Sequence, residues 1–84
     1  MPLAEARVGM RARVCEIRAG RAIKGRLLGL GLVPGVEVRV VRRTRRGPVV
    51  VAREGCRIVL GTGMGERIIV EEQLENPDRA GPGQ

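Results

Sequence analysis

The 84-residue sequence contains no histidine, and this absence excludes the commonest arrangements for nucleophilic catalysis. Ser–His and Cys–His pairs cannot be assembled without an imidazole. The carboxylates are scattered along the chain, and the glycine-rich segment 61–65 has neither the lysine of a Walker loop nor a surrounding βαβ unit. We therefore expect no catalytic residue and no enzymatic activity. Residues 61–65 are interpreted as a tight turn in which Met64 closes one end of the fold.

Phenylalanine, tyrosine and tryptophan are also absent. Grooves that bind proline-rich peptides are lined by aromatic side chains, and single-stranded nucleic acids usually stack their bases on such side chains. Both kinds of binding site are therefore disfavoured. Hydrophobic residues still make up 43% of the chain, so its core must consist of valine, leucine, isoleucine, methionine and alanine.

The two cysteines, Cys15 and Cys56, are too few and too far apart in sequence for a disulfide framework or a metal-binding cluster. Cys56 has the strand parity of Ile58 and Leu60, so it is expected to be a small core residue, whereas Cys15 is expected to face outwards. We therefore predict no metal site and no cofactor. No apolar run approaches the roughly 18 residues of a membrane span, and we expect a cytosolic protein with reduced thiols.

The formal net charge of +7 is unevenly distributed. Residues 71–84 carry a net charge of −3, so residues 1–70 carry +10. Such a domain is attracted to nucleic acid, to lipid headgroups or to an acidic protein face. The same charges are equally typical of a surface that is only solvated.

The densest charge cluster lies in a segment without acidic residues between positions 38 and 53. Strand periodicity places Arg39 and Arg43 on one face and Arg42 on the other, so the cluster is expected to surround the tip of a hairpin. Contact with RNA phosphate through these arginines is the alternative functional hypothesis. The arginine cluster consists of Arg42, Arg43, Arg45 and Arg46.

A short helix is predicted over residues 22–30, because Ile23, Leu27 and Leu30 form one apolar stripe at helical spacing. Gly25 and Gly29 each weaken this helix by about 1 kcal/mol. Packing against the rest of the fold must therefore hold it in place.

The residues after this helix predict a tight corner. Gly31 is expected in the left-handed conformation that ends a helix, and Leu32 in the hydrophobic contact that accompanies such a cap. Pro34 and Gly35 occupy the two central positions of a type II turn. From Val36 onwards valines alternate with charged residues, which predicts that a strand begins there.

Strands are predicted at residues 11–18, 36–43, 49–52, 56–60 and 67–70. A change of parity in the first strand predicts a bulge near Glu16, and Glu54-Gly55 predicts a two-residue hairpin turn. Residues 1–10 are interpreted as a lead-in with a turn at Gly9. Together these elements favour a small closed barrel as a single domain over residues 1–73, followed by a disordered acidic tail over residues 74–84.

The ordered set of motifs resembles the FeoA family over the segment from Leu3 to Val70. The most specific part is the segment 26–35 with the alternating valines after it, supported by Gly9 and by the closing pattern over residues 64–70. The resemblance implies an all-β fold with a short helix: a small SH3-like five-stranded β-barrel, with the helix inserted after the first strand. It also implies a small cytosolic accessory protein of bacterial ferrous iron uptake.

The partner implied by the resemblance is the membrane ferrous iron transporter, which has a cytosolic GTP-binding domain. We expect the chain to bind or modulate this transporter through protein–protein contacts, in the cytoplasm or recruited to the inner face of the membrane. A monomer or weak homo-oligomer is expected, and nucleic acid is the less favoured partner.

The predicted contact surface is the helix over residues 22–30 with its following turn, aided by the arginine cluster. A poorly self-supporting, cationic helix with small residues is suited to close docking on an acidic partner. The alternative is that its charges only keep a core-covering helix soluble. The helix residues assigned to partner binding are Arg21, Lys24, Gly25, Arg26 and Gly29.

Strand parity, the helical stripe and the resemblance together predict the core. It consists of Val14, Ile17, Leu27, Leu30, Leu32, Val36, Val38, Val40, Ile58, Leu60, Met64, Ile68 and Val70. Structural roles in the helix and corner are assigned to Leu27, Leu30, Gly31, Leu32, Pro34 and Gly35.

Overall fold

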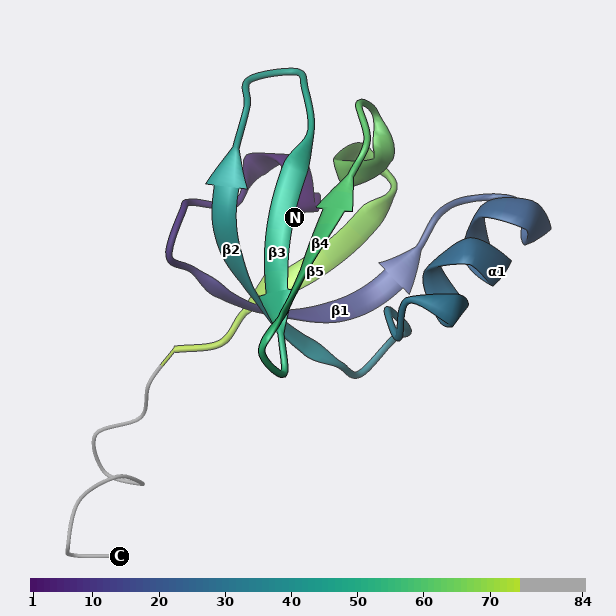
Figure 1. Cartoon of the computed structure of the whole chain (residues 1–84), viewed down its shortest axis with the longest axis horizontal. Helices are drawn as coiled ribbons and strands as arrows, with labels where there is room; N and C mark the ends of the chain where they lie inside the picture. The colour runs from purple at the N-terminus through teal and green to yellow at the C-terminus, as the bar shows by residue number, and fades with distance from the viewer. Residues whose placement is uncertain (75–84) are drawn as a thin grey trace, which may run out of the picture.

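The computed structural model describes residues 1–74 of the chain. Five strands, one α-helix and two short 3₁₀ helices follow one another along these residues, and the predicted strands and helix are all present (Figure 1). The predicted tail lies outside the described residues except for Leu74. The elements are η1 (Leu3–Glu5), β1 (Arg11–Ile17), α1 (Arg21–Gly29), β2 (Glu37–Arg43), β3 (Val49–Arg53), β4 (Cys56–Leu60), η2 (Met64–Glu66) and β5 (Ile68–Glu72).

The strands form one antiparallel sheet in the order β4-β3-β2-β1-β5. Figure 1 shows this sheet strongly curved, with α1 inserted between β1 and β2 and projecting to one side of the strands. The arrangement confirms the predicted fold class, a small five-stranded barrel with the helix after the first strand. The predicted closure is not found, because β4 and β5 do not pair within residues 1–74 and remain the two edges of the sheet.

A bulge in β1 explains how both of its apolar ends reach the core. The register with β5 shifts between Val14 and Glu16, as the sequence predicted, and the extra residue is Cys15. Because a bulge moves the following residues to the opposite face, Val14 and Ile17 are both buried although their parity differs. Cys15 is exposed, which confirms the prediction that it faces outwards.

A second bulge, in β2, was not predicted and corrects the arrangement of the arginines. The register with β3 shifts between Val40 and Arg42. Arg42 then pairs with Val50 and shares the outer face with Arg39, which pairs with Ala52. Arg43 pairs with the buried Val49 and lies on the opposite face, so the prediction that Arg39 and Arg43 share a face is wrong.

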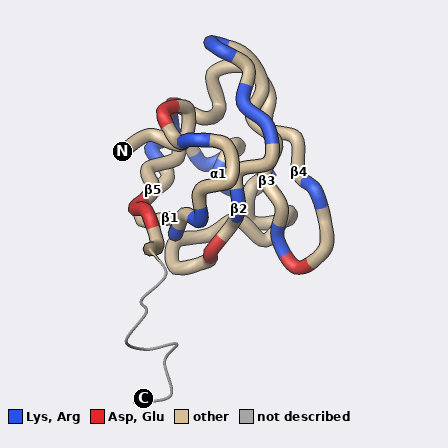
Figure 2. Tube along the Cα trace, turned by 90° about the vertical axis from the view of Figure 1, so that its left-hand side faces the viewer, with Lys and Arg blue, Asp and Glu red and all other residues tan. Residues whose placement is uncertain are grey.

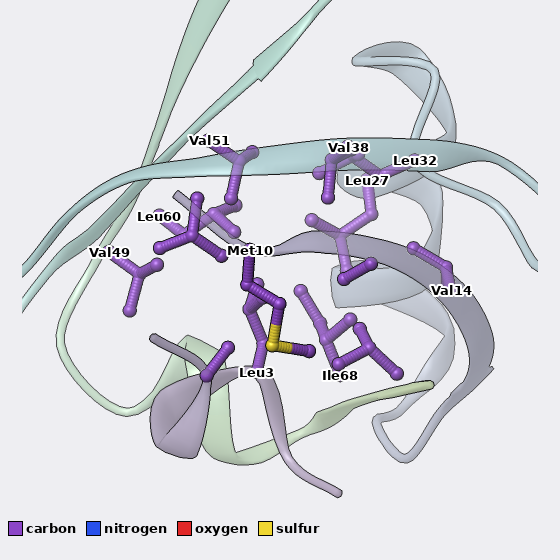
Figure 3. Packing of buried hydrophobic residues seen from close by; sticks show 14 of the residues in the cluster. Leu3, Met10, Val14, Leu27, Leu32, Val38, Val49, Val51, Leu60 and Ile68 are labelled. Carbon is purple, nitrogen blue, oxygen red and sulfur yellow. The ribbon is translucent and has the colours of Figure 1, made fainter. Parts of the chain in front are cut away.

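The core lies inside the curved sheet, and its side chains point towards one another from opposite walls (Figure 3). It contains no buried polar or charged residue. Six of its members were missing from the predicted core. These are Leu3, Ala6, Met10, Ala12, Val49 and Val51, each at most 4% exposed.

The first ten residues are therefore more than a lead-in. Leu3 is buried, and its short helix η1 packs against η2 at one end of the barrel. A side-chain carbon at Gly65 would lie only 3.2 Å from the backbone of Ala4. A side chain at position 65 would press η1 away from η2 by a few tenths of an ångström, so glycine favours their close approach, while the neighbouring Met64 is half-buried against the core.

Leu30 from the predicted core and Cys56, which was separately expected to be a core residue, are both exposed. Leu30, 48% exposed, is the C-cap residue that follows the nine-residue helix α1, which projects from the barrel, so only part of the apolar stripe reaches the core. Cys56 is exposed because it directly follows the hairpin turn Glu54-Gly55, beyond the end of the packed core. Strand parity alone could not identify where the barrel ends. Val36, Ile58 and Met64 are half-buried at the border of the core.

Candidate partner-binding surface

Helix α1 ends in a cap that fixes the corner after it. The amide of Leu32 donates to the carbonyl of Leu27 (2.8 Å), and the amide of Gly31 donates to the carbonyl of Leu28 (2.9 Å). These two hydrogen bonds form a Schellman motif, with Gly31 at φ +82°. The buried Leu32 supplies the hydrophobic contact, so the predicted cap is confirmed.

The type II turn after the cap is attached directly to β1. The amide of Val36 donates to Val33, and Gly35 has the predicted positive φ of +101°. The amide of Gly35 also donates to the carbonyl of Val14 (2.7 Å), and the amide of Val14 donates to Val36 (2.8 Å). The base of α1 is therefore held to the barrel by backbone hydrogen bonds as well as by packing.

The rest of α1 is only lightly covered. Leu27 is its single buried residue and Ile23 is half-buried, whereas Leu28 is 63% exposed. A hollow of about 370 Å³ lies between α1, the turn and β1. Its lining is Cys15, Glu16, Ile17, Lys24, Leu28, Leu32, Val33 and Pro34. The sequence pattern gave no signal for this hollow, because it is created by the angle at which α1 leaves the barrel.

The predicted cations of α1 are all exposed, and none forms an ion pair within residues 1–74. A side-chain carbon at Gly25 or Gly29 would meet nothing within 4 Å, so the fold itself does not require glycine there. We call the exposed set the α1 surface. It consists of Arg21, Lys24, Gly25, Arg26, Leu28, Gly29 and Leu30.

The arginine cluster lies at the tip of the β2–β3 hairpin, at the other end of β2 from α1 (Figures 1 and 2). All four arginines are exposed, and the guanidinium of Arg43 donates to the carbonyl of Ala4 (3.0 Å). The structure does not bring the cluster together with the α1 surface. A separate hollow of about 520 Å³ beside the tip is lined by Pro2, Ala4, Glu5, Arg43, Arg45, Arg46 and Glu66.

Among the residues that the structure describes, neither cysteine has a set of metal ligands around it. Within residues 1–74, no three carboxylate or thiol side chains lie close enough together to hold a metal ion. The Sγ of Cys15 is 3.8 Å from Oε2 of Glu71, and both groups are exposed to solvent. In the same part of the chain, none of the helices is long and apolar enough to cross a membrane.

The five-stranded sheet and the projecting cationic helix define a small barrel domain, and comparison with known proteins identifies its family. Residues 1–72 match the family described as the FeoA domain. The chain therefore belongs to the FeoA family, which is related to ferrous iron transport. The resemblance found in the sequence is confirmed.

Individual relatives agree with this assignment. A Methanocaldococcus jannaschii protein named "Putative Fe(2+) transport protein A" is 35% identical over 71 residues, which cover 84% of this chain and 85% of the relative. The crystal structure of an iron uptake regulatory protein (FeoA) has a TM-score of 0.80 at 29% identity, covering 87% of this chain and 97% of that one. The solution structure of a FeoA protein from Chlorobium tepidum has a TM-score of 0.79 at 32% identity, covering 90% and 73%.

Proposed function

We propose that this protein binds the cytosolic region of the membrane ferrous iron transporter that carries a GTP-binding domain, and modulates it by contact rather than by chemistry. Its place of action is then the cytoplasm, at the inner face of the membrane. One observation carries the proposal. The α1 surface combines exposed leucines, cations that form no ion pair within residues 1–74, and glycines that the fold itself does not need.

Each of these features suits a docking helix. The exposed side chains of Leu28 and Leu30 provide apolar area that a partner would remove from water. Lys24 and Arg26 favour an acidic partner, because complementary charges speed and orient association. Gly25 and Gly29 leave the helix backbone open to close approach, since no side chain separates it from the partner.

Charge reversal tests this proposal directly. The double variant Lys24→Glu, Arg26→Glu is expected to lower affinity for the purified cytosolic region of the transporter at least about tenfold, which corresponds to about 1.4 kcal/mol. Both side chains are exposed, so the fold should be retained. Affinity of the unaltered protein should also fall as salt is raised, because exposed charges are screened beyond about 8–10 Å at physiological ionic strength. Calorimetry or fluorescence anisotropy measures both effects.

The matched control reverses two arginines at the other end of β2. Arg45→Glu with Arg46→Glu changes the net charge by the same amount but leaves the α1 surface intact. If this control abolishes binding and the Lys24, Arg26 variant does not, the contact lies at the hairpin tip instead of α1.

The alternative function is contact between the arginine cluster and RNA. It is favoured by Arg42, Arg45 and Arg46, which are exposed and form no ion pair within the described chain. Two results together would favour this alternative over the transporter proposal. The purified protein would retain RNA that is lost when Arg45 and Arg46 are reversed, and it would not bind the transporter.

The purified protein is expected to retain no stoichiometric iron after dialysis, as measured by elemental analysis. Cys15 and Cys56 each lack a cluster of further ligands among the described residues, and soft or borderline metals are held by such clusters. The prediction would be contradicted if each chain bound one ferrous ion with micromolar affinity and if this binding were lost in Cys15→Ser or Cys56→Ser. Such a result would indicate a metal bridged between two chains.

A further inference from the structure

The sheet has two edge strands, and the chain covers one of them. Along β5, the amide of Val70 donates to the carbonyl of Met1 (2.7 Å), and the terminal amine of Met1 donates back to Val70 (2.9 Å). Pro2 forms a further bridge with Ile69. The N-terminal residues therefore occupy the outer side of β5.

The other edge, β4, has no such cover within residues 1–74, where it pairs with β3 alone. Its register is unbroken from the pair Arg53–Cys56 at the hairpin turn to the pair Val49–Leu60. Glu54 and Gly55 have φ +52° and +80°, the conformation of a two-residue type I′ turn. The residues that flank such a turn form a hydrogen-bonded pair.

The hydrogen-bonding direction of β4 follows from this turn. Hydrogen-bonded pairs alternate with non-hydrogen-bonded pairs along an antiparallel ladder, so Cys56, Ile58 and Leu60 bond to β3. The N–H and C=O groups of Arg57 and Val59 point away from β3, towards the open side. Neither residue has a backbone partner on that side within the described residues.

Proteins usually protect an open edge with proline, a bulge, a covering segment or several charges. β4 contains no proline, its ladder has no bulge, and it carries one charged side chain, that of Arg57. Val59 is 68% exposed beside the open backbone groups. An unprotected edge with an exposed apolar side chain is suited to accept a further strand.

The side chains around this edge indicate the chemistry of that strand. The ladders place Arg39, Ala52 and Arg57 in one row across the outer face, and Arg42, Val50 and Val59 in the next row. An added strand would extend both rows. Its outer-face side chains would then lie beside Arg57, which favours an acidic group, and beside Val59, which favours an apolar group.

A second copy of the chain would not supply this charge pattern. Residues 38–65 contain seven arginines and one acidic residue, Glu54, which pairs with Arg53. Two such segments placed side by side would repel each other. We propose that the β4 edge binds an extended acidic segment of a partner protein by strand addition. This inference does not depend on the α1 surface or on the identity of the transporter.

The test uses the full chain and a short synthetic peptide, Glu-Thr-Val-Thr-Glu-Thr-Val, whose glutamates and valines alternate on one face of a strand, so that one glutamate and one valine can lie beside Arg57 and Val59. Amide hydrogen exchange measured by NMR should slow at Arg57 and Val59 by at least about tenfold on saturation with the peptide. The amides of Ile58 and Leu60, which already bond to β3, should change little. The control is the peptide Lys-Thr-Val-Thr-Lys-Thr-Val, in which lysine replaces each glutamate, and it should not bind. If the glutamate peptide leaves the exchange at Arg57 and Val59 unchanged, the proposal is wrong.

Substitution by proline separates strand addition from simple charge attraction. Val59→Pro removes the outward N–H without removing a bond to β3, and proline is tolerated at edge strands in this orientation. Peptide affinity should fall at least about tenfold, whereas Val59→Thr keeps the N–H and should bind normally. Equal binding by both variants would contradict strand addition.

Arg57→Glu is the second variant, should Val59→Pro not fold. It leaves every backbone group in place and should reverse the charge preference of the β4 edge for peptides, so that the lysine peptide binds and the glutamate peptide does not. An unchanged preference would overturn the proposal.

If something other than an acidic segment of a partner occupied the β4 edge, the experiment would give a different result, and each such result would overturn the proposal. Protection of Arg57 and Val59 that grows with protein concentration in the absence of peptide would indicate a second copy. A variant ending at Leu74 that binds the peptide at least about tenfold more tightly would indicate that residues 75–84 occupy the edge. Equal affinity for RNA and for the peptide, without protection of these amides, would indicate an unspecific cationic face.

Discussion

Leu27→Ala is expected to lower the free energy of unfolding by about 2–5 kcal/mol. Leu27 is 1% exposed and is the only buried residue of α1, so truncation removes the main apolar contact between the helix and the barrel. A domain of this size holds only about 5 kcal/mol in total. With about 0–3 kcal/mol left, the variant should unfold at a markedly lower urea concentration than the parent protein, as measured by circular dichroism.

The neighbouring leucine provides a matched control. Leu28→Ala makes the same chemical change at a position that is 63% exposed, and it should alter stability by no more than about 0.5 kcal/mol. An unchanged denaturation midpoint in Leu27→Ala would show that α1 does not contribute to the core. Leu28→Ala should instead affect partner binding, because its side chain lies on the α1 surface.

Local features of the fold were predictable where a few adjacent residues determine the conformation. Gly31 and Gly35 supply the positive φ angles that the cap and the turn require, and both are found as predicted. The bulge near Glu16 and the hairpin turn at Glu54-Gly55 were predictable for the same reason. Each of these signals depends on conformational preferences of neighbouring residues rather than on distant packing.

Features that depend on distant parts of the chain were not predictable. Leu3 is buried because η1 meets η2, more than 50 residues further on, and no periodicity marks three residues of 3₁₀ helix. The bulge in β2 lies within a run of valines and arginines, and this run is compatible with a regular strand as well as with a bulged one. Leu30 was assigned to the core by helical spacing and Cys56 by strand parity, and neither pattern can show where the packed region ends.

The candidate site was predictable only in part. Charge and glycine content identified α1, but the exposure of Leu28 and the hollow beside it depend on how the helix leaves the barrel. The arginine cluster was predicted to assist α1, yet the length of β2 separates the two. The open β4 edge gave no signal in the sequence. It depends on the three-dimensional arrangement, in which the N-terminal residues cover β5 and leave β4 paired with β3 alone among the described residues.

Gly31→Val is expected to destabilise the protein by about 1–3 kcal/mol, because a β-branched residue is strained in the left-handed conformation. Gly31 has φ +82°, and a side-chain carbon there would lie 2.9 Å from Nη1 of Arg53. The guanidinium is the far end of a flexible side chain and can move, so backbone strain dominates the cost. Gly31→Asn should be milder, because asparagine tolerates this conformation.

Gly25 provides the contrasting control on the same helix. A side-chain carbon at Gly25 would meet nothing within 4 Å, and its φ is not positive. Gly25→Ala should therefore stabilise the protein by about 0.5–1 kcal/mol, through the higher helix propensity of alanine. Thermal or urea unfolding of both variants gives the comparison. If Gly31→Val were as stable as the parent protein, the cap would not hold Leu32 in the core, and the corner would have to be fixed by the hydrogen bonds between the turn and β1 alone.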